Sequence, residues 1–189
     1  MAKTYESITP ELATWIGEQQ MFFVASAPLA ADGLVNCSPK GMDSFRVLGP
    51  RQVAYLDLTG SGIETIAHLR ENGRIVFLLC SFGALPRIVR LHGRGEAIMP
   101  DSKEWSELRP RFLEHPGARA IVRADLTRIS DSCGYGVPRY EFQGHRDILE
   151  RSAKARGEAG MASYRSEKNA RSLDGLPGLE PRTQPSAGE

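Results

Sequence analysis

Short apolar runs, separated by glycine, proline and polar turns, set the pattern of hydrophobic positions along this chain. The runs are rich in β-branched and aromatic residues, which is typical of strands. The Ala31-Asp32-Gly33 turn predicts a hairpin between the first two runs. Gly93 and Gly95 mark sites for a bulge or bend in a later run. The predicted strands cover residues 21–26, 34–38, 45–48, 52–57, 75–80, 87–99 and 120–129.

Three other segments have helical features. Residues 9–20 open with Thr-Pro-Glu, in which a capping hydroxyl precedes a proline at the first helical position. A second helix is predicted over residues 61–72. A third is predicted to start at Asp101, which forms a capping box with Glu104. Pro110 should kink or divide this third helix, because proline cannot donate a backbone hydrogen bond.

Many short strands with few helices predict a mainly β fold: a small, closed or nearly closed β-barrel of six to seven strands with helices packed outside it. The tail has a different composition, since residues 174–189 are rich in proline and glycine. We therefore predict a barrel domain over residues 1–151 and a C-terminal helix with an extended arm over residues 152–189, which packs on the barrel or on a partner subunit. Composition alone also allows an unstructured end.

The charge balance and the cysteines narrow the classes of function. The 24 Lys and Arg residues nearly balance the 23 Asp and Glu residues, so neither nucleic acid nor a membrane is expected as a partner. The three cysteines form no CxxC pair and no Cys/His cluster, so no metal site is expected and a reducing compartment fits best. The first six residues lack the apolar stretch of a secretory signal, and the run over 75–80 is too short to span a bilayer. We expect a soluble, cytoplasmic protein.

Two segments could hold a phosphate. The first is Thr59-Gly60-Ser61-Gly62-Ile63-Glu64-Thr65, which follows the strand ending at Asp57. Ser61 and Glu64 form a capping box, so a helix should begin there with free N–H groups whose dipole favours an anion. The two glycines would let a ligand approach the backbone closely. The same residues would also suit an ordinary capped helix after a glycine turn.

The second segment is Asn36-Cys37-Ser38-Pro39-Lys40-Gly41, at the end of the predicted strand over 34–38. Ser38 offers a hydroxyl group and Lys40 a positive charge, and both suit a phosphate oxygen. A surface turn with a solvated lysine is the other interpretation. Neither segment is a dinucleotide fingerprint or a Walker motif, so a Rossmann fold is not expected.

The order of these motifs resembles the pyridoxamine 5'-phosphate oxidase-like family, the FMN-binding split barrels. The likeness covers nearly the whole chain and implies a homodimer with FMN at the subunit interface. It rests on Ser38-Pro39-Lys40-Gly41, Tyr55-Leu56-Asp57, Thr59-Gly60-Ser61-Gly62, Thr65-Ile66-Ala67-His68-Leu69 and residues 87–95, 132–138 and 168–177.

The resemblance also implies a set of cofactor contacts. The contacts expected at the phosphate are Ser38, Lys40, Gly60, Ser61 and Gly62, with Thr65 as a further polar group. The contacts expected on the ribityl or ring side are Asn36, Tyr55 and Asp57. The set is completed by Pro39, Gly41, Thr59, Tyr135 and Arg87, the last on a strand that approaches the flavin in relatives.

Departures from the family pattern argue against vitamin B6 chemistry. Pyridoxamine phosphate oxidases proper have a more basic phosphate loop, and an arginine and a histidine near the C-terminus that grip the substrate phosphate. Here residues 133–138 read Cys-Gly-Tyr-Gly-Val-Pro, and Cys133 and Tyr135 would also suit a tight, packed turn. The side chain of His68 is expected to pack against its neighbours rather than to take part in catalysis.

We therefore expect an FMN-dependent oxidoreductase that acts on a small molecule, with NADH or NADPH as the electron donor. No catalytic side chain is assigned, because a flavin itself carries hydride or electron transfer. Two alternatives stay open. One is a flavin-binding sensor, carrier or store without turnover, and the other is the same barrel holding a deazaflavin or heme.

Overall fold

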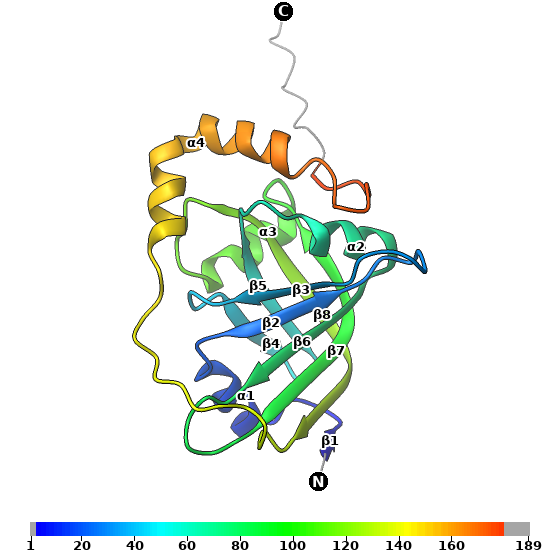
Figure 1. Cartoon of the computed structure of the whole chain (residues 1–189), viewed down its shortest axis with the longest axis vertical. Coiled ribbons are helices and arrows are strands. Elements are labelled where there is room, and N and C mark those ends of the chain that lie inside the picture. Colours follow the sequence, from blue (N-terminus) through cyan, green and yellow to red (C-terminus); the bar gives the residue numbers. More distant parts are fainter. Residues whose placement is uncertain (1–2, 180–189) are drawn as a thin grey trace, which may run out of the picture.

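The computed structural model describes residues 3–179, which form eight strands, four α-helices and one 3-10 turn. Figure 1 shows the strands crossing the middle of the molecule, with helices at both ends. The strands are β1 (Lys3–Tyr5), β2 (Phe22–Ser26), β3 (Asn36–Lys40), β4 (Phe45–Gly49), β5 (Gln52–Leu58), β6 (Arg74–Cys80), β7 (Ile88–Ile98) and β8 (Ala118–Ser132). The helices are α1 (Pro10–Gly17), α2 (Glu64–Asn72), α3 (Lys103–Leu108) and α4 (Ile148–Lys168), and the 3-10 turn is Arg109–Arg111.

The strands form one antiparallel sheet in the order β3-β2-β6-β7-β8-β5-β4, and β1 pairs with β8. This sheet confirms the predicted split β-barrel with helices around it. Its two end strands, β3 and β4, follow each other in sequence but do not pair, so the wall is open between them. Met42 (φ 61°) and Asp43 (φ 50°) connect them in the left-handed region, which is uncommon for residues other than glycine.

Alternating side chains of the strands fill the barrel. Four aromatic rings meet in the interior, with centroids 4.8–6.5 Å apart, and they belong to Phe22, Phe45, Tyr55 and Phe77. Such edge-to-face contacts add to the stability that burial provides. The predicted hairpin of β2 and β3 is confirmed, with Val24 opposite Ser38.

Predictions at the helix ends were partly right. Thr9 Oγ1 accepts a hydrogen bond from the N–H of Leu12 (3.2 Å), which confirms the first cap. The third helix is capped by Ser102, so the cap predicted at Asp101 was wrong, and Pro110 ends the helix in a 3-10 turn as expected. The second helix begins at Glu64 rather than 61, because residues 59–62 are held in a separate turn described below. The short strand β1 was not predicted.

The C-terminal segment covers one end of the barrel. Helix α4 is interrupted at Gly157 (φ 63°, ψ −177°), so it turns a corner over the barrel end that carries α2 and α3 (Figure 1). It begins at Ile148, four residues before the boundary expected at 152. The arm over 174–189 is described only as far as 179. Within residues 3–179, no helix is long and apolar enough to cross a membrane.

A β-carbon at Gly93 is expected to destabilise the barrel. The register of β7 on β8 shifts between His92 and Gly93, which confirms the predicted bulge. An added Cβ would lie 2.5 Å from the carbonyl oxygen of Asp125, a backbone atom that cannot easily move. Gly93→Ala should therefore lower the free energy of unfolding in urea by about 1–3 kcal/mol. Gly49→Ala is the matched control, because its Cβ would meet nothing within 4 Å; equal effects would contradict this explanation.

Candidate functional site

A buried carboxylate with two cations lies where β3, β5 and β8 meet. Asp57, near the end of β5, is 1% exposed. Its carboxylate accepts hydrogen bonds from Lys40 Nζ at 3.2 Å and from Arg119 Nε at 2.6 Å. Arg119 is buried, whereas the Lys40 side chain is 24% exposed. The cluster of these three residues therefore carries a net positive charge, with the lysine on its solvent side.

The cations keep Asp57 ionised. Burial alone would raise the pKa of this carboxyl, but Arg119 and then Lys40 hold the pKa below its ordinary value. Beside the cluster, burial and the charge of Asp57 raise the pKa of Tyr55 well above 10. The Tyr55 hydroxyl is buried, and the side chains of Asp57 and Thr65 are its polar neighbours. It is a neutral group with a proton to donate.

The turn over residues 59–62 presents its amide groups in one orientation. Asn169 Nδ2 donates to the carbonyl of Gly60 (3.0 Å), and Arg119 Nη1 donates to the carbonyl of Gly62 (2.8 Å). Because a trans peptide places C=O and the next N–H on opposite sides, the N–H groups of Ser61 and Ile63 face away from these two side chains.

These N–H groups remain free to bind a ligand. No residue of the described chain accepts a hydrogen bond from the N–H of Ser61, Gly62 or Ile63. A Cβ added at Gly60 would have no atom within 4 Å, so there is room for a ligand beside this residue. The first turn of α2 begins at Glu64, shortly after the turn. Unpaired amides at a helix start next to a net positive cluster form a concavity suited to an anion such as a phosphate.

The second predicted segment lies against this helix start. Asn36 Nδ2 on β3 donates to Thr65 Oγ1 on α2 at 3.0 Å, and Ser38 Oγ donates to Asn36 Oδ1 at 3.0 Å. The fold therefore brings together the two segments that the sequence marked as phosphate-binding. His68 is fully buried, and its Nδ1 lies 3.0 Å from Ser26 Oγ, which fits the packing role expected of it.

Most of the expected contacts belong to this region. Those placed in the network or lining it are Asn36, Ser38, Lys40, Tyr55, Asp57, Thr59, Gly60, Ser61, Gly62 and Thr65. Pro39 is exposed on the edge strand β3, and Gly41 follows it, where a Cβ would lie 3.1 Å from the carbonyl of Gln20. Within residues 3–179, no cluster of side chains could hold a metal ion.

Arg87 and Tyr135 are not brought to this region. Arg87 Nη2 donates to Asp131 at 2.8 Å and to the Tyr5 hydroxyl at 2.9 Å, at the opposite end of β8 from Arg119. Its guanidinium also stacks on Trp15. Tyr135 is 83% exposed in the loop after β8, away from any described site residue.

Sequence reasoning missed two residues that shape the site. Arg119 stands one residue before the predicted strand over 120–129, and nothing in the local pattern distinguishes it from a surface arginine. Asn169 is fully buried, and its Oδ1 accepts a hydrogen bond from Arg119 Nη1 (2.9 Å). A signal for Asn169 existed, because it lies in the stretch over 168–177 that carries part of the family likeness.

The Asp131–Arg87 pair is expected to make the free energy of unfolding depend on pH in the acidic range. Burial alone would raise the pKa of Asp131, but hydrogen bonds from Tyr5 and Arg87 hold the pKa below its ordinary value. Because the pKa of Asp131 is lower in the folded protein than in the unfolded one, its ionised form stabilises the fold. This stabilisation is complete above the unfolded pKa of about 3.9 and is lost as the pH falls through the folded pKa. Wild type should therefore exceed Asp131→Asn in urea stability at neutral pH, and the difference should shrink towards about pH 3. A constant difference would contradict the assignment.

Comparisons with known proteins point to one family. The model of the family described as "Pyridoxamine 5'-phosphate oxidase" matches residues 8–165. A curated Aspergillus flavus protein, the "Pyridoxamine 5'-phosphate oxidase family protein ustO", is 41% identical in an alignment that covers 93% of this chain and 77% of that protein.

Solved structures share the fold at low identity. The HupZ protein of Group A Streptococcus has a TM-score of 0.51 and 22% identity, with 65% of this chain and 91% of that chain covered. A putative pyridoxamine 5'-phosphate oxidase from Lactobacillus delbrueckii has a TM-score of 0.50 and 20% identity, with 67% and 98% covered.

Proposed function

The chain belongs to the pyridoxamine 5'-phosphate oxidase family, and from that premise we propose that it binds flavin mononucleotide and acts as a flavin-dependent oxidoreductase on a small molecule. One observation carries the proposal. The positive cluster of Lys40, Asp57 and Arg119 stands beside a turn whose amide groups are unpaired, and a phosphate monoester satisfies both.

The residues present fit a flavin phosphate. Lys40 is half-buried and can approach an anion, while Arg119 stays buried against Asp57. The N–H groups of residues 61–63 would donate to phosphate oxygens, and the open space at Gly60 gives the ligand room.

A bound flavin would supply hydride or electron transfer. We call the cluster of Lys40, Asp57 and Arg119, together with the N–H groups of residues 61–63, the anion cradle, and its role would be to bind and orient the phosphate. Asp57 is held ionised between two cations, and Tyr55 is held neutral. The second candidate is a flavin-binding protein without turnover, because phosphate binding by these groups does not itself require a reaction.

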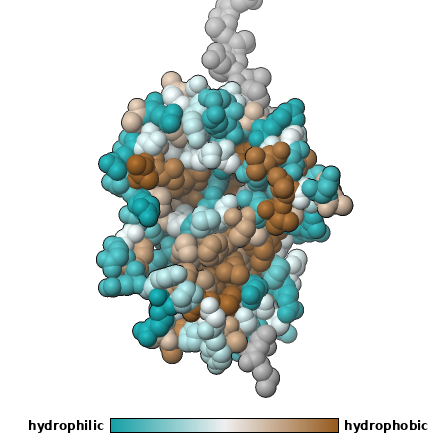
Figure 2. Space-filling model, in the orientation of Figure 1, coloured by the Kyte–Doolittle hydropathy of each residue, from teal (hydrophilic) through white to brown (hydrophobic). Residues whose placement is uncertain are grey.

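A homodimer with the cofactor at its interface is part of the proposal. Phe23 and Ala25 of β2 point away from the barrel interior beside Leu78 and Val76 of β6, and all four remain partly exposed. Figure 2 shows the apolar surface in the middle of this face. A contiguous apolar face is typical of a protein interface, and we propose a second copy of this chain as its partner. Light scattering should give about twice the 20.8 kDa of one chain.

We also place the protein in the cytoplasm. Cys37, Cys80 and Cys133 are free thiols in the described chain, which supports a reducing compartment.

The absorption spectrum of the purified protein tests the proposal. We expect a yellow protein with oxidised-flavin bands, from which denaturation releases FMN. A colourless protein that takes up no FMN on titration would refute the proposal. A heme or deazaflavin spectrum would show that the barrel binds that cofactor in place of FMN.

Anaerobic addition of NADH or NADPH separates the two candidates. Rapid bleaching of the flavin, followed by re-oxidation with an added acceptor, is expected of the oxidoreductase. A flavin that neither nucleotide bleaches would favour the binding protein.

A further inference from the structure

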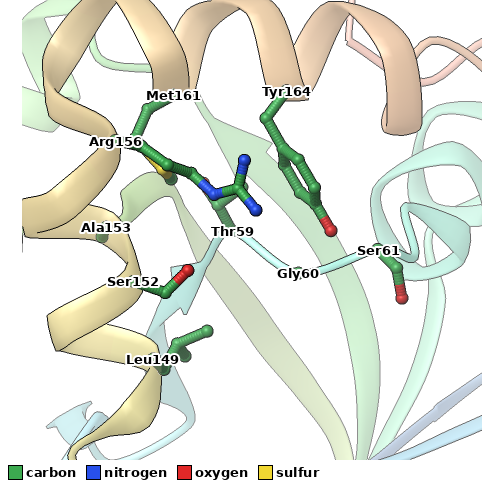
Figure 3. Close-up of a pocket in the computed structure, with 9 residues that line it drawn as sticks. All are labelled: Thr59, Gly60, Ser61, Leu149, Ser152, Ala153, Arg156, Met161 and Tyr164. Carbon is green, nitrogen blue, oxygen red and sulfur yellow. The ribbon is translucent and has the colours of Figure 1, made fainter.

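A cavity lies in the corner that α4 forms over the barrel end. It measures about 240 Å³, is open to solvent on one side, and is lined by both halves of α4 and by the turn over residues 59–61 (Figure 3). The corner exists because Gly157 adopts φ 63° and ψ −177°, a conformation that residues with a β-carbon rarely adopt. The cavity is therefore built by a specific break in the helix.

One positive charge reaches into this cavity. Arg156 is the only residue with a formal charge among those that line it, and Figure 3 shows its guanidinium pointing between the helix halves and the turn. No carboxylate of the described chain lies within ion-pair distance of it, and the nearby Glu167 is paired with Lys168. The guanidinium lies 4.6 Å from the centre of the Tyr164 ring. Stacking orients the guanidinium while leaving its in-plane N–H groups free to bind a carboxylate at two points.

The remaining lining is half apolar and half hydroxyl. Leu149, Ala153 and Met161 provide the apolar wall, and Ser152 points into the space in Figure 3. The volume is below the roughly 300–1,000 Å³ of pockets for drug-sized ligands. A single inorganic ion would leave the apolar wall in contact with water. A small molecule with an apolar body would cover it.

We propose that this cavity is a binding site for a small organic carboxylate with an apolar body. Its carboxylate pairs with Arg156, and its body packs against Leu149 and Met161. The cavity and the anion cradle share the turn over 59–61, but the cavity is lined by α4 and the cradle by β3, β5 and β8. The inference does not rest on the proposed flavin chemistry.

Methyl NMR of FMN-treated, full-length protein labelled at the methionine methyl groups tests the proposal, with benzoate as the probe. Met161 lines the cavity, and its signal is identified through Met161→Leu. We expect a saturable shift of the Met161 signal with benzoate, and a much weaker response to the neutral analogue benzyl alcohol or to inorganic phosphate. The signal of Met99, which packs against Ile63, Ile66 and Ala120 and does not line the cavity, should shift much less.

Arg156→Gln should weaken benzoate binding by roughly ten- to a hundredfold, as expected for the loss of a charged hydrogen-bond pair. The matched control is Arg151→Gln, because Arg151 lies on the same helix, is paired with Asp147 and does not line the cavity. This control should bind benzoate like the wild type.

Any one of four results with the probe molecules would overturn the proposal, and a fifth result concerns FMN. The four are an unmoved Met161 signal at millimolar benzoate, equal binding of benzyl alcohol, equal binding of inorganic phosphate, and unchanged affinity in Arg156→Gln. Loss of FMN from Arg156→Gln, with FMN retained in Lys40→Ala, would also overturn it, since the cavity would then be the cofactor phosphate site. A failure of FMN binding alone would leave the Met161 response intact, so the two proposals fail separately.

Discussion

Asp57→Asn is expected to lower the free energy of unfolding by about 3–5 kcal/mol, which is the usual cost of removing one partner of a buried ion pair. The substitution leaves Arg119 charged, 5% exposed and without its carboxylate. Arg119 also holds the carbonyl of Gly62 and the side chain of Asn169, so its displacement should disturb the turn over 59–62. Urea unfolding, followed by far-UV circular dichroism, measures the loss.

The control for this prediction is Asp125→Asn on the same sheet. Asp125 is exposed and contacts the side chain of Gln52, so its loss should change stability by no more than about 0.5 kcal/mol. A second variant tests the cause. If the unpaired charge is responsible, Asp57→Asn combined with Arg119→Met should be more stable than Asp57→Asn alone. A double variant that is less stable than Asp57→Asn would show that lost packing, and not the unpaired charge, causes the destabilisation.

Lys40→Ala should weaken the binding of FMN by roughly ten- to a hundredfold while leaving riboflavin binding unchanged. The lysine supplies the net positive charge of the cluster, because Arg119 and Asp57 without it are neutral as a pair. A hydrogen bond to a charged group contributes about 1.5–3 kcal/mol, which corresponds to that loss of affinity. Riboflavin lacks the phosphate, so its affinity reports all the flavin contacts except those to the phosphate. Fluorescence quenching of each flavin on titration gives both affinities.

Lys103→Ala controls for a general loss of positive charge. Lys103 is 89% exposed on α3 and pairs only with Glu107 among the described residues, so FMN binding should be unaffected. Lys40→Arg should retain most of the affinity, because it keeps the charge. Equal weakening of FMN and riboflavin in Lys40→Ala would place the lysine away from the phosphate.

The strands and their barrel could be predicted because their signal is local. β-branched and aromatic residues are frequent in most of the runs, and a single residue, Gly93, predicts the bulge. The phosphate segments could also be found, since each consists of neighbouring residues. Their meeting through Asn36 and Thr65, at 3.0 Å, follows from the barrel closing and from no local pattern.

The remaining features depend on contacts between distant parts of the chain. Arg119 and Asp57 are 62 positions apart, and Asn169 reaches Gly60 across 109. Those contacts hold the turn over 59–62 outside the helix, which is why the capping box of Ser61 and Glu64 predicted the wrong start for α2. The ion pair of Arg87 with Asp131 is likewise invisible until β7 and β8 pair.

The bonds from Asn169 to the turn separate what the barrel needs from what the ligand site needs. All eight strands lie before residue 169 in the sequence, so strand pairing does not depend on the side chain that holds the carbonyl groups of Gly60 and Ser61. A protein cut just before residue 169 would keep every strand of the sheet and lose the side chain that orients the turn over 59–62. Damage to this segment would therefore impair ligand binding before it unfolds the barrel.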